Sequence, residues 1–167
     1  HPQKVVLHPG YIGGLGIHVM EMSIGYAMQS LEQIMDRADH LGICVCIENM
    51  FPKYPGWIKA DDFNQILDRF PSIMLTLDIG HAHIGSKNER RALQFMDAFP
   101  DRIQHIHVSD NFRKEDSHLP IGAGNIRYEE MVKGLKKIGY NRTITVEVFS
   151  SNREFVRFSK KRISQLF

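Results

Sequence analysis

The sequence predicts an α/β fold, a partial (β/α)8 barrel built from five parallel strands with intervening helices. Short runs with a period of two alternate with longer stretches whose apolar residues recur about every 3.6 positions. Each short run ends on an acid or a histidine. One face of these runs is small or polar, whereas the other is β-branched or leucine. This contrast fits a narrow barrel interior and a helix-covered exterior.

The predicted strands are five short runs, at residues 5–8, 43–48, 75–78, 105–107 and 144–147. Successive side chains of a strand point to opposite faces, so alternate residues share a face. In the last four runs one face carries only Ile, Val or Leu. The other face carries Cys44, Cys46, Glu48, Thr76, Asp78, His105, His107, Thr145 and Glu147. We therefore expect an apolar face under the helices and an inner face that carries polar groups.

Apolar stripes typical of helices follow the strands. They span residues 31–41, 63–70, 93–99, 128–138 and 155–166. Asp61 and Asp62 favour a helix start at the second stripe, because carboxylates stabilise helix N-termini. Pro100 and Gly139 end the third and fourth stripes. A doubly wound open sheet is the competing architecture, but its central strands would be apolar on both faces.

The length indicates a single domain over residues 1–167, since a chain of 167 residues with 43% hydrophobic composition buries one sizeable core. A closed barrel takes eight strands and about 250 residues, so this domain is expected to lack the first three strands. A five-stranded piece would expose two long sheet edges. We expect a missing N-terminal segment or a homo-oligomer to cover them.

The bulk composition gives little indication of a partner. A net charge of +2, from 21 Lys and Arg against 19 Asp and Glu, gives no whole-chain argument for a polyanion. The sequence shows no membrane span and no signal-peptide pattern, so a cytoplasmic protein is expected. Cys44 and Cys46 lie two apart on one strand, where a mutual disulfide is disfavoured, and are expected to be reduced. The basic cluster at 153–162 is interpreted as a solvated helix face.

Four strand-end residues form a candidate metal site. The carboxyl ends of parallel strands meet at one edge, where α/β barrels carry their chemistry. That edge would hold Glu48, Asp78, His107 and Glu147. Oxygen and imidazole ligands suit a divalent cation, with Zn or Mn expected and Mg or Co as further options. A salt bridge would explain either glutamate alone, whereas a metal explains the whole set.

His81 and His8 are candidates near this set. His81 follows Asp78 by three residues, and Gly80 would permit a tight turn that brings both over one pocket. A strand-end Asp that only caps the next helix explains the segment equally well. His8 ends the first run, and a solvent-facing histidine before a turn is an equally good interpretation.

Asp116 and His118 lie in a predicted loop rather than at a strand end, where they could bind a further metal ion. Gly122 and Gly124 of the same loop allow close backbone approach to a ligand, or simply shape the loop. For His105, deeper in its strand than His107, a satisfied core histidine is the favoured interpretation.

The order of these residues resembles the xylose isomerase-like TIM-barrel superfamily, which contains sugar and sugar-phosphate isomerases and epimerases and also endonuclease IV. The resemblance covers essentially the whole chain and corresponds to the last five strands of the family. It rests on an ordered set of motifs: HPG at His8, ENM at Glu48, LDIGH at Asp78 and His81, HVSDN at His107, DSHLPIGAGNI at Asp116 and His118, and VEVF at Glu147.

The resemblance implies two different metal contents. In the epimerase branch, one divalent ion is held by Glu48, Asp78, His107 and Glu147. In the endonuclease branch, a three-metal cluster also uses His8, His81, Asp116 and His118. The chain has both sets, so the ligands alone do not choose between the branches.

Departures from endonuclease IV favour the epimerase branch. An aromatic loop over residues 50–57, which ends at Trp57, stands where endonuclease IV has small and polar residues and suits packing over a small ring or chain. DIGH also replaces the DTCH type of motif. We therefore expect a divalent-metal-dependent isomerase or epimerase, with a sugar or sugar-phosphate-like hydroxycarbonyl compound as its small-molecule substrate.

The expected reaction proceeds through an enediolate. Glu48 and Glu147 would remove and return the proton from opposite sides, while His81, His8 and Trp57 would contact the substrate. Two alternatives stay open. One is endonuclease IV-like hydrolysis of abasic-site DNA, the only case with a nucleic acid partner. The other is a catalytically idle barrel that binds a metabolite or a protein.

Overall fold

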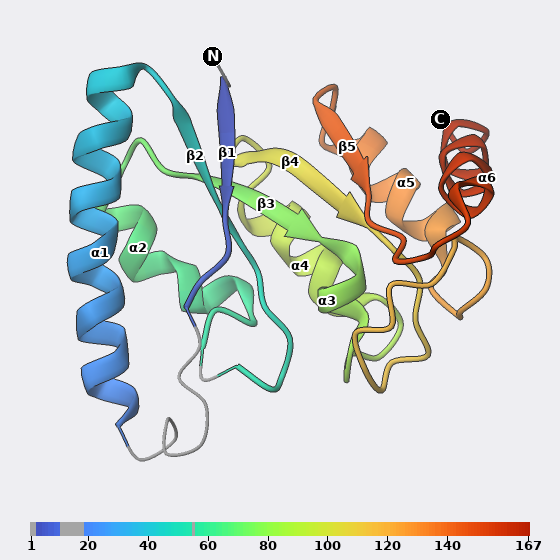
Figure 1. Ribbon diagram of the computed structural model, residues 1–167, viewed down its shortest axis with the longest axis horizontal. Coiled ribbons are helices and arrows are strands. Elements are labelled where there is room, and N and C mark those ends of the chain that lie inside the picture. Colours follow the sequence, from blue (N-terminus) through green and yellow to red (C-terminus); the bar gives the residue numbers. More distant parts are fainter. Residues whose placement is uncertain (1–2, 11–18, 55) are drawn as a thin grey trace.

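Five parallel strands form one sheet in the computed structural model of the protein, which describes residues 3–10, 19–54 and 56–167. The strands are β1 (Lys4–Leu7), β2 (Cys44–Glu48), β3 (Met74–Asp78), β4 (Ile103–Val108) and β5 (Thr143–Val146). They lie side by side in sequence order, with every neighbouring pair parallel. All carboxyl ends therefore meet at one edge of the sheet, the lower edge in Figure 1.

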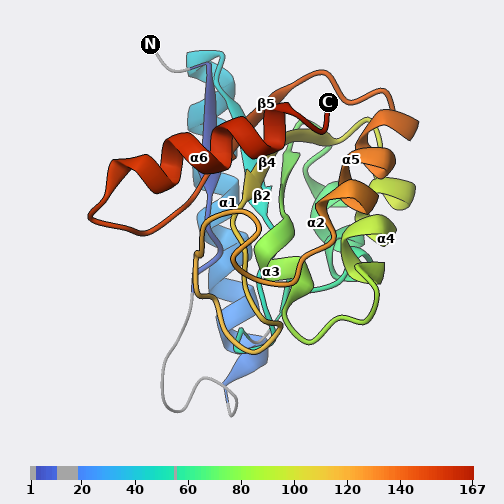
Figure 2. The same cartoon turned by 90° about the vertical axis from the view of Figure 1, so that its right-hand side faces the viewer.

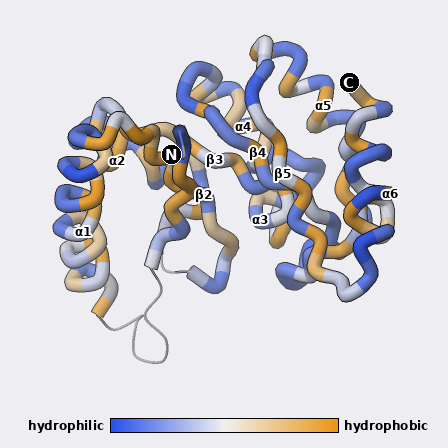
Figure 3. The backbone as a smooth tube through the Cα atoms, turned by 45° about the horizontal axis from the view of Figure 1, so that its top comes forward, coloured by the Kyte–Doolittle hydropathy of each residue, from blue (hydrophilic) through white to orange (hydrophobic). Residues whose placement is uncertain are grey.

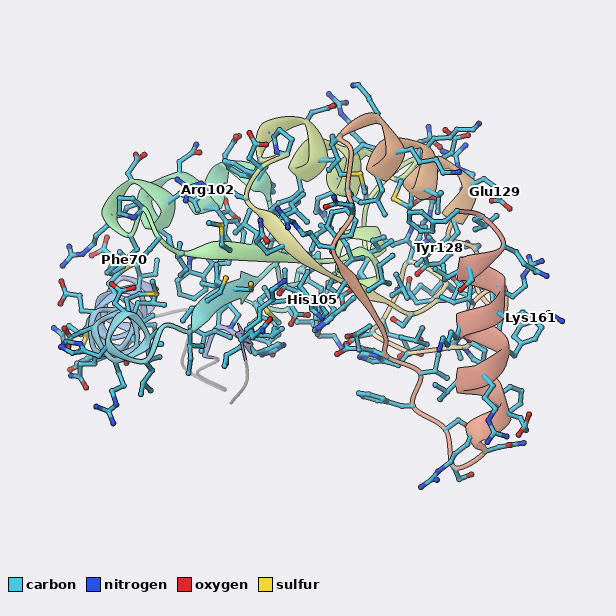
Figure 4. The ribbon with its side chains drawn as sticks, turned by 90° about the horizontal axis from the view of Figure 1, so that it is seen from above. Phe70, Arg102, His105, Tyr128, Glu129 and Lys161 are labelled. Atoms are coloured by element: carbon cyan, nitrogen blue, oxygen red, sulfur yellow. The ribbon has the colours of Figure 1, made fainter. Side chains whose placement is uncertain are left out.

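Helices connect the strands and cover one face of the sheet. They are α1 (Met20–Leu41), the 3-10 helix η2 (Ala60–Phe63), α2 (Asn64–Arg69), α3 (Ile79–His83), α4 (Arg90–Ala98), α5 (Tyr128–Lys137) and α6 (Arg153–Ser164). Seen from above, the helices form an arc from α1 round to α6, and His105 lies on the opposite, concave side of the sheet (Figure 4). This arrangement is half of a TIM barrel. The predicted fold class is confirmed, and the competing open sheet is wrong.

The helices largely coincide with the predicted stripes, but α1 begins at Met20, well before the stripe at residues 31–41. The first helix ends at Leu41, where Gly42 adopts a left-handed φ of 63°. Asp62 lies in the first turn of the second helix, as predicted, and its Oδ2 accepts hydrogen bonds from the backbone N–H of Ile58 at 2.8 Å and of Lys59 at 3.0 Å. That helix is short, however, and consists of the 3-10 turn η2 followed by α2.

The hydrophobic core lies between the sheet and the helices. Ile47, Leu75 and Ile106 of the central strands are almost completely buried there. The rings of Phe63 in η2 and Phe95 in α4 meet edge to face with centroids 5.4 Å apart. Hydrophobic and hydrophilic segments alternate along the helices in Figure 3, the pattern of amphipathic helices. Each fully buried Ile, Leu or Phe side chain contributes about 1.5–3 kcal/mol to folding.

A register shift between β3 and β4 sets which side chains share the concave face. Leu75 pairs with Ile103, but the next residue of β3, Thr76, pairs with His105. One extra residue of β4 is therefore accommodated, as in a β-bulge. Beyond the shift Asp78 pairs with His107. Without it Asp78 would lie beside Ile106, and His107 would turn to the helices.

Cys44 and Cys46, the two cysteines of the sequence, carry free thiols whose Sγ atoms lie 3.8 Å apart. Burial raises the pKa of the Cys46 thiol to about 12, so Cys46 acts as a small neutral group of the concave face. Within the described residues β1 and β5 are the two edges of the sheet. In the same part of the chain, no helix has the length and apolar character that a bilayer crossing needs.

Candidate metal centre at the strand ends

Four side chains from four strand ends meet at the carboxyl edge. Glu48 ends β2, Asp78 ends β3, His107 is the penultimate residue of β4, and Glu147 follows β5. One ligand atom of each lies within 4.8 Å of those of the others. The Nδ1 of His107 is central, 3.3 Å from Glu48 Oε1, 3.2 Å from Glu147 Oε1 and 3.9 Å from Asp78 Oδ2. We call these four residues the strand-end group.

Two buried polar atoms of the strand-end group have no hydrogen-bond partner among the described residues, and a cation would bind both. They are Asp78 Oδ2 and His107 Nδ1. A buried polar atom without a partner costs about 1–3 kcal/mol. Three carboxylates around one imidazole also carry an excess of negative charge. A divalent cation would bind the orphaned atoms and neutralise that charge.

The pKa values reflect this crowding. Burial raises the pKa of Asp78 to about 6, and the Glu48 carboxylate adds to the rise against the opposing effect of His81. Burial also opposes the charged form of His107, but Glu48, Glu147 and Asp78 outweigh it and raise the pKa of the imidazole. The carboxylates thus favour a proton on His107, which a bound cation would replace.

A second group of candidate ligands comes from His81, Asp116 and His118. The Nε2 atoms of both histidines approach the same oxygen, Asp116 Oδ2, at 3.3 Å from His81 and 3.0 Å from His118. Asp116 Oδ1 is buried and has no hydrogen-bond partner among the described residues. We call these three residues the loop group, because Asp116 and His118 lie in the loop between β4 and α5.

Hydrogen bonds at the far side of each ring fix the histidines of the loop group. The Nδ1 of His81 donates to the backbone carbonyl of Asn49 at 2.9 Å, and that of His118 donates to the carbonyl of Glu147 at 2.8 Å. These bonds leave the Nε2 atoms of both rings facing Asp116. Metal-binding histidines usually donate their other N–H in this way, which fixes ring and tautomer.

His81 belongs to the loop group and also lies next to the strand-end group. Its Nδ1 is 3.3 Å from Glu48 Oε1, and its Nε2 faces Asp116. Burial opposes the charged form of this imidazole, but Asp78, Asp116 and Glu48 together raise its pKa to about 10. Burial raises the pKa of Asp116, whereas His118 and His81 outweigh burial and lower it far below its usual range.

The segment after β3 is a one-turn helix, α3, rather than the predicted tight turn. Asp78 caps this helix, since its Oδ1 accepts a hydrogen bond from the His81 N–H at 2.6 Å, while Oδ2 faces the strand-end group. Asp78 therefore caps α3 and also contributes an oxygen to the strand-end group. Gly80 has no positive φ, but an added Cβ would lie 2.6 Å from Ser109 Oγ. The glycine permits close packing of α3 on the end of β4.

His8 and Trp57 lie at the margin of these groups. The His8 ring is 6.1 Å from the ring of His81, and within the described residues His8 belongs to neither group. Trp57 is buried and lines a cavity of about 540 Å³ with Leu7 and His8, between the ends of β1 and β2 and helix α1. Pro55 of the predicted aromatic loop lies outside the described residues.

Among the described residues His105 belongs to neither group, although its ring lies 5.0 Å from that of His107. Its ring nitrogens contact the hydroxyls of Thr143 at 2.6 Å and Thr145 at 3.0 Å. Burial, together with the charges of His107 and Lys4, lowers its pKa to about 4. His105 thus has hydrogen-bond partners for both ring nitrogens, but it is half-buried on the concave face and lies outside the hydrophobic core.

Three residues without a predicted role contact the candidate ligands. Asn49 is buried and holds the end of β3, where its Oδ1 accepts from the Asp78 N–H at 2.7 Å. Phe51 packs on the His81 ring with centroids 4.9 Å apart. Phe149 stacks on His118 at 3.9 Å and 9°. The ENM and VEVF motifs contain or border these positions, but the sequence alone does not show which side chains these residues contact.

Comparison with known families matches residues 3–165 to a family described as xylose isomerase-like TIM barrel. An uncharacterized protein of Methanocaldococcus jannaschii is 33% identical over 149 residues, which are 87% of this chain and 50% of that protein. A fructoselysine 3-epimerase of Escherichia coli is 23% identical over 127 residues, 74% of this chain and 45% of the enzyme. The chain thus spans about half the length of these relatives.

Solved structures share the fold. A D-tagatose 3-epimerase-like protein superimposes with a TM-score of 0.86 at 29% identity, over 98% of this chain and 61% of that one. The IOLI protein with a bound zinc atom gives a TM-score of 0.73 at 20% identity, over 99% and 64%. A D-allulose 3-epimerase of Methylomonas sp. in complex with D-allulose gives 0.69 at 20% identity, over 97% and 62%.

Proposed function

Because the chain belongs to the xylose isomerase-like TIM-barrel family, we propose that the protein is a divalent-metal-dependent isomerase or epimerase of a sugar-like hydroxycarbonyl compound. The observation that carries the proposal is the meeting of Glu48, Asp78, His107 and Glu147 within 4.8 Å at the strand ends. The names of the relatives support the substrate class, since they include epimerases of fructoselysine and D-allulose. The zinc atom of the IOLI protein supports a metal ion.

The strand-end group would hold the ion. When bound, a divalent cation supplies Lewis-acid polarisation to the carbonyl and adjacent hydroxyl of the substrate. Zinc or manganese suits the three carboxylates and one imidazole, and magnesium or cobalt is compatible with them.

Two glutamates are the candidates for proton transfer. Glu48 ends β2 and Glu147 follows β5, so they enter the site from different strands of the half-barrel, yet both contact the same His107 nitrogen. One carboxylate would take the proton from the carbon beside the carbonyl, and the other would return it to the opposite face of the enediolate. His81, which lies next to Glu48 of the strand-end group, would contact a substrate hydroxyl. His8 and Trp57 would border the far end of the substrate.

Proton exchange tests this function directly. The intact protein, loaded with zinc or manganese, is incubated with D-tagatose, D-allulose or their phosphates in D₂O. Deuterium incorporation beside the carbonyl and formation of the epimer are expected by NMR, and a chelator is expected to stop both. Elemental analysis gives the ions per chain. A protein that takes up neither metal after loading would contradict the proposal and favour the idle, ligand-binding barrel.

The loop group favours a second candidate function, hydrolysis of a phosphodiester at abasic sites in DNA. His81, Asp116 and His118 add a second set of ligands next to the first, and clustered ions activate water and stabilise the leaving oxygen. Cleavage of an abasic-site duplex by the metal-loaded protein, without exchange on sugars, would decide for this candidate.

A further inference from the structure

The loop between β4 and α5 has to be held in place for the loop group to form. It carries Asp116 and His118, whereas His81 belongs to α3, and the loop lies beside α3 in both Figure 1 and Figure 2. Backbone bonds tie the loop to its surroundings, including the pair between Asp110 and Leu119, both at 2.9 Å, and one from Gly85 N–H to the Arg113 carbonyl at 3.0 Å. A further bond, from the Asn125 N–H to the Asn111 carbonyl at 3.0 Å, joins the start of the loop to its end.

The loop also contains strained backbone. Arg113 has a φ of 67° and His118 a φ of 44°, in the left-handed region that side chains other than glycine rarely adopt. Such conformations cost about 1–3 kcal/mol each and persist where the surrounding structure enforces them. Contacts that enforce the conformation at Arg113 therefore influence the loop that leads to Asp116.

Glu89 supplies those contacts from the start of α4. Its side chain is 1% exposed, and its carboxylate binds three segments at once. It accepts from His83 Nδ1 in α3, lies 3.4 Å from Arg113 Nη2, and lies 3.5 Å from Arg127 Nε and 3.3 Å from the Arg127 backbone N–H. Arg113 and Arg127 lie on either side of Asp116 and His118. One buried carboxylate therefore joins α3 to both ends of the loop.

His83 completes the network on the side of α3. It is 1% exposed, and its Nε2 lies 3.2 Å from Arg113 Nε and 2.8 Å from Asn125 Oδ1. His83 follows His81 by two residues on the same short helix, α3. A contact that fixes His83 against Arg113 thus also fixes the distance between His81 and the loop.

Stability alone does not require such a network. Replacing a buried ion pair by apolar groups of similar volume is often neutral or stabilising, and buried charges serve in some proteins to specify one arrangement. Glu89 belongs to neither candidate ligand group among the described residues. Its contacts go instead to the two pieces of chain whose relative position decides whether the loop group exists.

We propose that Glu89 is a positioning residue, which acts through His83 and Arg113 to hold Asp116 and His118 against His81, so that the loop group binds its own divalent cation. The inference rests on the proposed function, because it assumes that the ligand groups bind metal. It goes beyond that function in naming residues that contact no ligand but decide the occupancy of the second site.

The test is a count of ions and their affinities in the intact protein. Zinc binding is measured by equilibrium dialysis and elemental analysis for the unmodified protein, Glu89→Gln and a matched control, Glu130→Gln, whose carboxylate is exposed and pairs with Lys133. We expect two ions per chain in the unmodified protein and in the control. Glu89→Gln is expected to keep the first ion and to bind the second at least about 10-fold more weakly, as for other groups that orient metal ligands.

A double variant separates positioning from a general loss of stability. If Glu89 acts through the loop group, Glu89→Gln has no further effect on zinc binding once Asp116→Asn has removed the second site. Glu89→Asp, which keeps the charge, is expected to restore part of the second affinity. Should Glu89→Gln fail to fold, Arg113→Gln, whose side chain is 32% exposed, is expected to weaken the second ion in the same direction.

Each other result overturns the inference in a distinguishable way. An unmodified protein that binds a single ion refutes the second site but leaves the proposed function intact. Unchanged affinity for the second ion in Glu89→Gln, or equal loss of both ions, refutes the positioning role alone. An unmodified protein without any bound ion refutes the proposed function and the inference together.

Discussion

His107 and Glu147 face each other across the end of the sheet, with 3.2 Å between Nδ1 and Oε1. The side chain of Glu147 is 26% exposed, whereas that of Glu48, on the other side of the same nitrogen, is 4% exposed. The two glutamates therefore differ in environment although they contact the same imidazole. Glu147 is therefore the more accessible of the two carboxylates.

Glu147→Gln tests the proton-transfer role. The amide keeps the shape of the side chain but cannot take a proton, so kcat is expected to fall by about 10²–10⁴-fold. Because the side chain is partly exposed, the free energy of unfolding is expected to change by less than about 1 kcal/mol. Glu154→Gln, an exposed residue paired with Arg157, serves as the control. Activity within twofold of the unmodified protein would remove Glu147 from the mechanism.

His107 and His105 offer a matched pair for testing metal ligation. They share a strand face, with ring centroids 5.0 Å apart, but only His107 contacts the carboxylates of the strand-end group. His107→Gln is expected to lose the ion of that group, with at least about 10-fold weaker zinc binding. His105→Gln is expected to keep it. Equal effects of the two substitutions on zinc affinity would argue against the strand-end site.

Proton release on metal binding follows from the environment of His81. Its carboxylate neighbours outweigh burial and raise its pKa to about 10, above the ordinary 6.5, so the folded protein holds this proton at pH 7. A metal ligand must be deprotonated, so zinc affinity of the loop group is expected to rise with pH up to about pH 10. Calorimetry in two buffers of different ionisation enthalpy counts the protons. His81→Asn is expected to release about one proton fewer, and a buffer-independent heat would contradict the assignment.

Asp78→Asn is expected to stabilise the protein in the presence of a chelator. Burial raises the pKa of Asp78 from 3.8 to about 6, so the fold disfavours the ionised carboxylate. Its destabilising contribution is absent below the unfolded pKa and complete above the folded one. Asparagine can still accept the His81 N–H, so urea unfolding at pH 7.5 should show a gain of about 1–3 kcal/mol that vanishes near pH 4. A loss of stability at pH 7.5 would contradict this account.

The strand-end group could be predicted from the sequence because strands impose a simple parity. In β2, β3 and β4 the final acid or histidine falls on the same face as small or polar residues, and parallel pairing brings these ends together. The register shift at Thr76 could not be predicted. The shift depends on how β3 and β4 pack, and no residue in the alternating pattern of these strands indicates it.

The loop group was only partly predictable. Asp116 and His118 are two positions apart in the sequence, so they can be recognised as a pair. His81 lies more than 30 positions before them, and only tertiary contacts bring it close. The role of Glu89 was even harder to predict from the sequence. A glutamate before an amphipathic helix looks like a solvent-exposed start of that helix, and only the packing of α3 and the loop around it shows that it is buried.

Gly124 tests how tightly that loop packs on the end of β4. An added Cβ would lie 2.3 Å from Asp110 Oδ1 and 2.4 Å from the Asn111 carbonyl, both much closer than van der Waals contact. Asp110 is fully buried and its Oδ1 accepts from the Ile126 N–H at 3.1 Å, so it has little freedom to move away. Gly124→Ala is therefore expected to lower the free energy of unfolding by about 1–3 kcal/mol.

Gly25→Ala provides a control of opposite sign, because Gly25 lies inside α1 and an added Cβ there would meet nothing within 4 Å. Alanine in a helix interior is expected to raise the free energy of unfolding by about 0.5–1 kcal/mol. Urea denaturation of both variants makes the comparison. Equal free energies of unfolding for Gly124→Ala and Gly25→Ala would show that the loop has room to shift. Close packing at Gly124 would then not be what holds Asp116 and His118 against His81.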